Sequence, residues 1–253
     1  MAKIIEQLLH EKALRRWRRI ATEAPTTDLA TLRIHRARAQ ALEHQLRRIL
    51  HIADSRLSLP LAGTNAIERP IGTDWAWRPE IWHGRIFPSG TVAAANGTRF
   101  GSEARIFHDC PVSELCLRQV RNRHEDVLAP FALRMDVFRF DGSFLSLALE
   151  LPPDSVAGLR KTHLLRMDMH VEFEKPLEIF ARLNIRHGPN TEQLVRELPR
   201  REGEVLVEFD LAYSRLNEKR IERMWVDLIF EEPEMNQILL RDVTFIRRPR
   251  AEI

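Results

Sequence analysis

The sequence contains only two cysteines and no apolar run of the roughly 18 residues that a membrane-spanning helix needs. It therefore predicts neither a disulfide framework nor a transmembrane segment. The N-terminus, MAKIIEQLLHEKALRRW, lacks the apolar core and small-residue cleavage site of a signal peptide. These absences lead us to expect a cytoplasmic protein.

Recognisable catalytic and cofactor motifs are also absent. There is no Gly-x-Ser-x-Gly sequence and no phosphate-binding glycine loop. Cys110 and Cys116 follow His108 and Asp109 without the spacing of a zinc site. Several carboxylates alternate along the expected strands, which is typical of solvent-facing charge. We therefore expect no catalytic residue, no metal and no cofactor, and an enzyme is the least favoured class.

Length and charge indicate a large soluble domain with a basic appendage. The chain has 253 residues, of which 44% are hydrophobic and 30% charged, as in ordinary globular proteins. Residues 1–53 contain 11 Lys and Arg against 5 Asp and Glu, whereas the remainder holds 28 against 31. A basic head can meet an anionic partner, or it can simply expose an arginine-rich helix face to water.

Residues 1–55 are expected to form a helical hairpin. Apolar residues recur at steps of three and four over 3–23, and Pro25 ends that helix. Asp28 and the two preceding threonines offer N-caps for a second helix over 28–53. That helix carries a heptad-like apolar stripe, which must pack on the first helix, on the rest of the chain or on a second copy.

Residues 56–103 lose this periodicity and form a strap that we expect to dock on the domain that follows. Prolines and glycines are spaced along it, as in turns and loops. It also carries Trp75, Trp77 and Trp82, which a solvated linker would lack. The tryptophans could form an exposed ligand platform or a hydrophobic plug. The plug is favoured, because the strap lies between two parts that leave a seam to fill.

Residues 104–253 alternate between apolar and polar positions. In HLLRMDMHVEFEK and LEIFARLNIRHG, every second residue is apolar, which places one face of each strand in a core and the other in water. At least six such runs, separated by turn residues, predict an antiparallel β-sandwich.

A resemblance to known families agrees with this pattern. The runs FRFDGSFLSLALELPPDSV and MWVDLIFEEPEMNQILLRDVTFIRRP resemble jelly-roll sandwiches of the galactose-binding or carbohydrate-binding-module type, which often end in a strand like the one that bears Leu240, Asp242, Val243 and Phe245. Over nearly its whole length the chain is also similar to an uncharacterised domain family of Rhodobacter-type alphaproteobacteria. We therefore expect an α+β, mainly β, fold: a jelly-roll sandwich preceded by a helical hairpin.

The resemblance implies that a ligand would bind to the outer face of a sheet or to loops at one end. Asp168 and His170 face outward on one expected strand, and Phe180, Arg182 and Asn184 on the next. If these strands are neighbours, the five side chains form direct cross-strand pairs around an aromatic ring. Alternatively, a helix or the strap covers the ring, and the charges are ordinary surface pairs.

Further candidate ligand-binding residues lie outside these two strands. His187 and Asn190 belong to a polar loop at a strand end, where binding residues are frequent but where Gly-Pro-Asn also makes a plain turn. Trp75 and Trp77 complete the set if the strap exposes them.

The leading hypothesis is a non-catalytic recognition module that binds a glycan or a glycan-like surface through the sandwich, with residues 1–53 serving oligomerisation or attachment. The alternative is a structural protein, such as a component of a phage-like particle, that uses the same face to bind a protein partner. Nucleic acid is not favoured, since the arginines lack DNA-binding spacing. A membrane partner is not favoured either, because packing between the helices would explain the same stripe.

Overall fold

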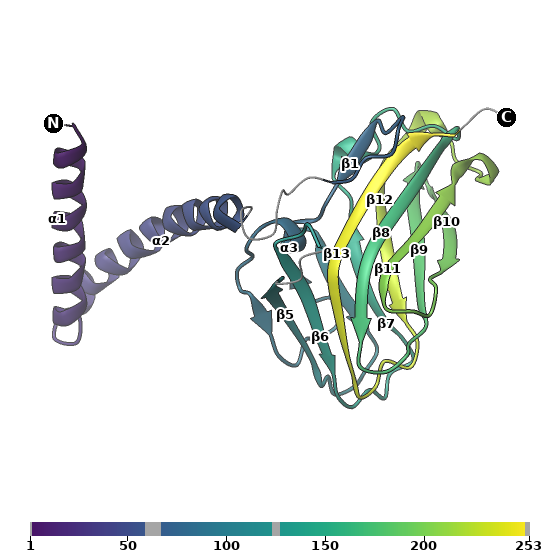
Figure 1. Ribbon diagram of the computed structural model, residues 1–253. Helices are drawn as coiled ribbons and strands as arrows, with labels where there is room; N and C mark the ends of the chain where they lie inside the picture. Colours follow the sequence, from purple (N-terminus) through teal and green to yellow (C-terminus); the bar gives the residue numbers. More distant parts are fainter. Residues whose placement is uncertain (1, 59–66, 123–126, 251–253) are drawn as a thin grey trace. The chain divides into compact units, whose positions relative to one another are not determined.

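The computed structural model describes residues 2–58, 67–122 and 127–250. Residues 59–66 of the predicted strap, together with 1, 123–126 and 251–253, lie outside the described residues. The chain divides into two compact units, residues 1–52 and residues 53–253, which are described separately (Figure 1).

The N-terminal unit contains the two expected helices, α1 (Ala2–Glu23) and α2 (Leu29–Ser58), the second of which continues past the unit boundary. Asp28 caps α2, because its Oδ1 accepts hydrogen bonds from the backbone N–H of Ala30 at 3.0 Å and of Thr31 at 2.9 Å. Neither helix is long and apolar enough to cross a membrane over the part of the chain that the structure describes.

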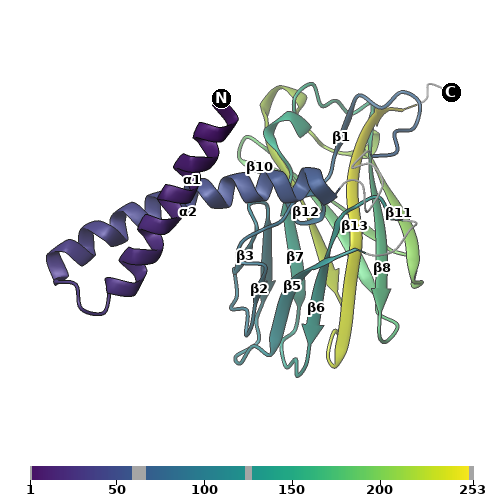
Figure 2. The same ribbon diagram turned by 60° about the vertical axis from the view of Figure 1, so that its left-hand side comes forward.

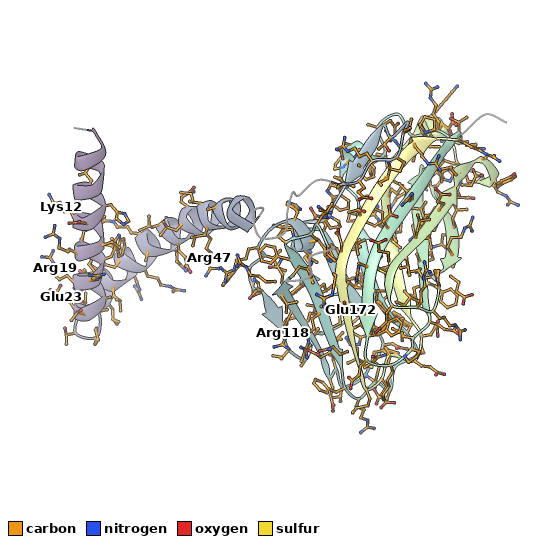
Figure 3. All side chains as sticks on the ribbon, in the orientation of Figure 1. Lys12, Arg19, Glu23, Arg47, Arg118 and Glu172 are labelled. Carbon is orange, nitrogen blue, oxygen red and sulfur yellow. The ribbon has the colours of Figure 1, made fainter. Side chains whose placement is uncertain are left out.

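The apolar stripe of α2 is not buried by α1. Leu42, Leu46 and Ile49 are 40%, 50% and 63% exposed, whereas Trp17 and Ile20 of α1 are half-buried. Lys12 and Arg19, labelled in Figure 3, project from the same side of α1. The hairpin therefore presents both apolar and basic side chains to solvent.

Residues 67–122 and 127–250 form a sandwich of two antiparallel sheets, which both views show as two layers (Figures 1 and 2). Sheet I has the order β11-β8-β13-β6-β5-β2, with β1 paired to β13. Its strands are β1 (Trp75–Trp77), β2 (Gly90–Thr91), β5 (Leu115–Arg121), β6 (Phe131–Val137), β8 (His163–Phe173), β11 (Gly203–Asp210) and β13 (Asn236–Pro249).

Sheet II has the order β10-β9-β12-β7-β4-β3. Its strands are β3 (Arg99–Phe100), β4 (Ala104–His108), β7 (Leu145–Glu150), β9 (Ile179–His187), β10 (Asn190–Glu197) and β12 (Ile221–Phe230). One short helix, α3 (Glu80–His83), and three 3₁₀ turns (Pro153–Ser155, Leu211–Tyr213 and Glu218–Arg220) connect the strands. The prediction of a mainly β, jelly-roll sandwich preceded by a pair of helices is confirmed.

The core lies between the two sheets and follows the alternation seen in the sequence. On β8 and β9 the apolar members of each alternating pair are buried, while most of their polar neighbours remain partly exposed. The main departure is Asn184, an outward residue of sheet II that is only 1% exposed. Other side chains must therefore cover the outer face at that point.

The tryptophans of the strap belong to this core. Trp75 is 8% exposed and Trp82 is fully buried, and the Nε1–H of Trp82 donates a hydrogen bond of 2.8 Å to the carbonyl of Leu240. Trp77 is partly buried and stacks on Phe245, an inward residue of β13, with ring centroids 5.9 Å apart. The stretch is a plug, because β1 extends sheet I beside β13 and directs the rings of Trp75 and Trp77 inward.

Candidate functional site

The two strands expected to carry the site lie in different sheets. β8 pairs with β11 and β13 of sheet I, whereas β9 pairs with β10 and β12 of sheet II. Asp168 and His170 therefore lie on one outer face of the sandwich, and Phe180, Arg182 and Asn184 lie on the opposite one. The expected cross-strand pairing between the two groups is wrong, because the chain passes from one sheet to the other between β8 and β9.

The other candidate residues lie at a turn and in the core. His187 is 6% exposed and Asn190 is exposed, and the two are cross-strand partners at the turn between β9 and β10. Gly188 has a φ of 59° at this turn, which glycine adopts without strain. Trp75 and Trp77 face the core and form no exposed platform.

The outer face of sheet I contains a polar cavity of about 350 Å³. The guanidinium of Arg166 binds the carboxylate of Asp168 on the same strand, with both Nε–Oδ distances at 2.8 Å. Arg78 binds Asp242 through two parallel hydrogen bonds of 2.8 Å, from Nε to Oδ1 and from Nη2 to Oδ2. Glu172, labelled with Arg118 in Figure 3, pairs with Arg241 on this face. The main charges of this face are thus already matched to one another.

The outer face of sheet II carries a groove of about 390 Å³ whose floor is a small residue. Ala148 lies on β7, between Asp227 of β12 and Arg105 of β4 in register. Because a methyl group rises little above the sheet, the larger side chains on the two flanking strands form walls around it. The lining residues are Ser102, Glu103, Arg105, Phe107, Ala148, Glu150, Arg223, Trp225 and Asp227.

Asp227 lies in one wall of the groove, and its side chain is only 8% exposed. Its Oδ2 accepts hydrogen bonds from Nε of Arg182 at 3.0 Å, from Nη2 of Arg182 at 2.9 Å and from Nδ2 of Asn184 at 2.9 Å. Its Oδ1 accepts no hydrogen bond from the described residues, yet it is not sealed from solvent. A carboxylate that is held on one oxygen and has no protein donor on the other can accept a hydrogen bond from a ligand in the groove.

Asn184, on the neighbouring strand β9, helps to hold the Asp227 carboxylate in place. Its amide nitrogen donates to Asp227 and to the carbonyl of Arg182, and its Oδ1 accepts a bond of 2.8 Å from Nε2 of Gln193. All these bonds lie on the outer face of sheet II, which explains why a buried asparagine is tolerated there. Arg182 and Asn184 therefore position Asp227, and Asp227 is the group that reaches the groove.

Aromatic rings line the groove on both sides of Ala148. Trp225 lies two residues before Asp227 on the same strand, and Phe107 lies on β4; both are partly exposed. The guanidinium of Arg223 lies over the ring of Trp225, 4.8 Å from its centroid, and pairs with Glu150 at 3.6 Å. The groove thus combines apolar ring surface with hydrogen-bonding groups, as ligand pockets generally do.

Phe180 lies on the same outer face but outside the groove. It lines a separate hollow of about 450 Å³ with Glu178 and Arg200, which form an ion pair. In the register of sheet II it lies beside Ile229, one strand closer to the sheet edge than Asp227. The aromatic residue chosen from the sequence is therefore not the one that meets Asp227.

Sequence reasoning missed Trp225, Asp227, Phe107 and Ala148. Trp225 and Asp227 occupy the outward positions of β12, between buried Met224, Val226 and Leu228. A tryptophan two residues from an aspartate on an outward face was an available signal. Among the described residues, no group of three or more Asp, Glu, His and Cys side chains could hold a metal ion.

The fold and the groove define a jelly-roll β-sandwich with a polar, aromatic-lined depression on one outer face. The chain belongs to a family of unknown function, DUF6478, which it matches over residues 1–253. No curated protein matches it.

Several solved structures are similar to the sandwich. The family 11 carbohydrate-binding module from Clostridium thermocellum, in complex with a β-1,3-1,4-mixed-linked tetrasaccharide, is 10% identical with a TM-score of 0.39, covering 62% of this chain and 96% of that one. The CBM22-1 xylan-binding domain from Paenibacillus barcinonensis is 10% identical with a TM-score of 0.35, covering 64% and 94%.

The enzymatically active domain of tailspike protein 4 from bacteriophage CBA120 is 5% identical with a TM-score of 0.41, covering 57% of this chain but only 19% of that one. At these identities and TM-scores the likenesses describe architecture and carry no argument about a ligand.

Proposed function

We propose that the protein is a non-catalytic recognition module that binds a glycan in the groove on sheet II. The observation that carries this proposal is the meeting of the Trp225 ring and the open Oδ1 of Asp227 above the floor at Ala148. A sugar ring has an apolar C–H face and a rim of hydroxyls. An aromatic ring packs against the C–H face, and a carboxylate oxygen accepts a hydrogen bond from a hydroxyl.

The remaining lining residues complete this recognition. Phe107, on the opposite wall, adds a second apolar surface, and Glu150 and Arg223 offer an acceptor and a donor at the edge of the Trp225 ring. Ala148 leaves the space in which the sugar would lie. Arg182 and Asn184 hold Asp227 in place before the ligand arrives, which lowers the entropy lost on binding.

Binding is favoured over hydrolysis by the state of the lining carboxylates. A glycosidase needs one carboxyl that carries and releases a proton and another that faces it across the scissile bond. Asp227 is held by Arg182, and Glu150 is paired with Arg223 at 3.6 Å. The third lining carboxyl, Glu103, has a pKa raised by burial, but its Oε2 accepts a hydrogen bond of 2.7 Å from the backbone N–H of Glu80. All three lining carboxyls are thus already engaged by protein groups.

A glycan array tests this function. We expect the full-length chain to bind at least one class of glycan, and Trp225→Ala and Ala148→Leu to lose that binding, the first by removing a ring and the second by filling the floor. Phe180→Ala is the matched control, because it removes an aromatic ring from the same face outside the groove. Thermal unfolding of each variant shows that the fold is retained.

Two results would contradict the proposal. Absence of any bound glycan for the intact protein removes the function itself. Full binding by Ala148→Leu together with loss in Phe180→Ala moves the site to the hollow beside Phe180.

The N-terminal helices are proposed to serve oligomerisation or attachment. The exposed stripe formed by Leu42, Leu46 and Ile49 supports this, since exposed apolar stripes at helical spacing commonly bind another helix. Sedimentation of the full chain and of the triple variant Leu42→Gln/Leu46→Gln/Ile49→Gln compares their masses. A smaller particle for the variant supports oligomerisation through the stripe, and an unchanged mass argues against it.

The alternative is a structural role, in a phage-like particle or another assembly, in which the same face of sheet II binds a protein. The hollow beside Phe180, with exposed Val195 on β10 of the same face, is the feature that such contact would use. This alternative predicts no glycan binding and a loss of partner binding in Phe180→Ala.

A further inference from the structure

Two arginines lie directly opposite each other at the edge of the groove. Arg99 on β3 and Arg105 on β4 are cross-strand partners, and the next pair, Phe100 and Ala104, faces the core. Both arginines therefore point to the outer face of sheet II, and both are exposed. Arg105 also lines the groove, together with Phe107 and Trp225.

Neither guanidinium is neutralised by a carboxylate in the described part of the chain. Arg99 and Arg105 form no ion pair with any residue that the structure describes. By contrast, Arg223 on the other wall is paired with Glu150, and Arg182, on the strand behind that wall, is paired with Asp227. Like charges directly opposite each other on neighbouring strands, with Cβ atoms roughly 5 Å apart, destabilise a sheet. The pair is therefore a local cost to folding that a bound anion would remove.

Protection of the sheet edge against pairing with other chains can explain Arg99 but not Arg105. Charged residues on an edge strand discourage pairing with other chains, and β3 is the edge strand of sheet II. Arg105, however, is on β4, which is covered by β3 on one side and β7 on the other. Its charge protects no edge, and it faces the groove.

The other charges at this end of the groove do not cancel the pair. Glu103 lines the groove, and burial, reinforced by the nearby Glu80 carboxylate, raises its pKa above the usual value. The Oε2 atom of Glu103 accepts a hydrogen bond of 2.7 Å from the backbone N–H of Glu80. This bond turns the Glu103 carboxyl toward the strap. Arg99 and Arg105 thus have no ion-pair partner among the described residues, and the nearby Glu103 carboxyl is already bonded to the strap.

We propose that the glycan bound in this groove is anionic, and that a carboxylate or sulfate group on it bridges Arg99 and Arg105. The sugar ring then lies against Phe107 and Trp225, with one hydroxyl donating to Oδ1 of Asp227. Guanidinium groups bind both anions through paired N–H donors, so the two ligand types share one chemistry. This inference rests on the proposed function and specifies its ligand class.

Matched polysaccharide pairs test the ligand class. Polygalacturonate carries free carboxylates that its fully methyl-esterified form lacks, and dextran sulfate carries sulfates that dextran lacks; each pair shares one sugar backbone. Binding of the full-length chain to each is measured by affinity electrophoresis or calorimetry at two salt concentrations. We expect binding to at least one charged polymer that is at least about tenfold tighter than to its neutral partner, and weaker at high salt.

Variants test whether Arg99 and Arg105 cause the preference for the charged polymer. Arg99→Gln/Arg105→Gln should lose at least about tenfold in affinity for the charged polymer, as expected when charge-assisted hydrogen bonds are removed. Arg118→Gln/Arg139→Gln, at two exposed arginines outside the groove, removes the same net charge as a control and should bind like the wild type. Trp225→Ala should also lose binding, which ties the anion site to the groove.

The outcomes separate the two claims. Preference for the carboxylated or for the sulfated polymer identifies the anion. Equal binding to charged and neutral partners, abolished by Trp225→Ala, overturns the anionic class and leaves the glycan function standing. Equal loss in the Arg118→Gln/Arg139→Gln control and in Arg99→Gln/Arg105→Gln also overturns it, because the attraction is then one of overall charge. No binding to any polymer, together with an empty glycan array, removes the function.

Discussion

The guanidinium of Arg78 binds the carboxylate of Asp242 through two hydrogen bonds of 2.8 Å, joining the strap to the last strand. The side chains are only 4% and 17% exposed. Burial raises the pKa of Asp242, while the neighbouring Arg78 opposes that shift. The ion pair is therefore a buried contact that fixes the strap at the bulge of β13 between Leu240 and Asp242.

Breaking this pair should destabilise the sandwich. We expect Asp242→Ala to lower the free energy of unfolding by about 3 kcal/mol, because the Arg78 guanidinium stays buried after its carboxylate is removed. The double variant Arg78→Met/Asp242→Ala should cost less than the sum of the two single variants, as measured by urea unfolding in a double-mutant cycle. A coupling energy near zero would show that the strap does not depend on this contact.

A second prediction separates the core tryptophan from the tryptophan of the groove. Trp82→Phe removes the donor to the carbonyl of Leu240 and leaves a void in a fully buried site, which should cost about 2–4 kcal/mol. Trp225→Phe should cost less than about 1 kcal/mol, since Trp225 is half-buried on the outer face. Thermal unfolding compares the two; equal losses would mean that Trp225 is also part of the core.

Much of the fold could be predicted because strand burial is a local property. On β8, Met167 and Met169 are buried and Asp168 is not, as the two-residue period requires. Which strands become neighbours is not local. The five residues between Phe173 and Ile179 carry the chain to the other sheet, and no periodicity within β8 or β9 reports that crossing.

The candidate site was partly predictable for the same reason. Arg182 and Asn184 are predictable because they are polar and outward. Asp227, the residue they hold, lies 45 and 43 residues later in the sequence, on another strand. The plug was foreseen from the strap's tryptophans and prolines. The pairing of β1 with β13, which points Trp75 and Trp77 inward, was not.

Glu103 provides a prediction about pH. Burial raises the pKa of Glu103, so the folded protein disfavours its ionised form more than the unfolded chain does. This group therefore lowers stability at neutral pH, and the penalty disappears as the pH falls through the folded-state pKa and past the unfolded one. Glu103→Gln should raise the midpoint of thermal unfolding at pH 7, with the gain shrinking toward acid pH.

Unfolding midpoints measured across that pH range for wild type and variant check this expectation. The exposed Glu231→Gln is the control, since it makes the same change at a position outside the groove. If the increase in unfolding midpoint caused by Glu103→Gln grows toward acid pH, burial does not penalise the ionised form of Glu103 and the prediction is wrong.

A side chain at Gly142 should destabilise the fold for steric reasons. A Cβ at this position would lie 2.5 Å from Oδ1 of Asp109, 2.9 Å from Sγ of Cys110 and 3.0 Å from the backbone nitrogen of Cys110. Asp109 cannot give way easily, because its carboxylate accepts bonds from the backbone N–H and the hydroxyl of Ser143 at 2.7 and 2.6 Å. Gly142→Ala should therefore lower the free energy of unfolding by about 1–3 kcal/mol.

The matched control for this substitution is Gly158→Ala. Gly158 has open space around the same Cβ position but a φ of 69°, so alanine there tests backbone strain without a clash. Adding Asp109→Ala should recover part of the loss in Gly142→Ala and none of the loss in Gly158→Ala. If Asp109→Ala leaves the cost at Gly142 unchanged in urea unfolding, contact with the carboxylate is not its cause.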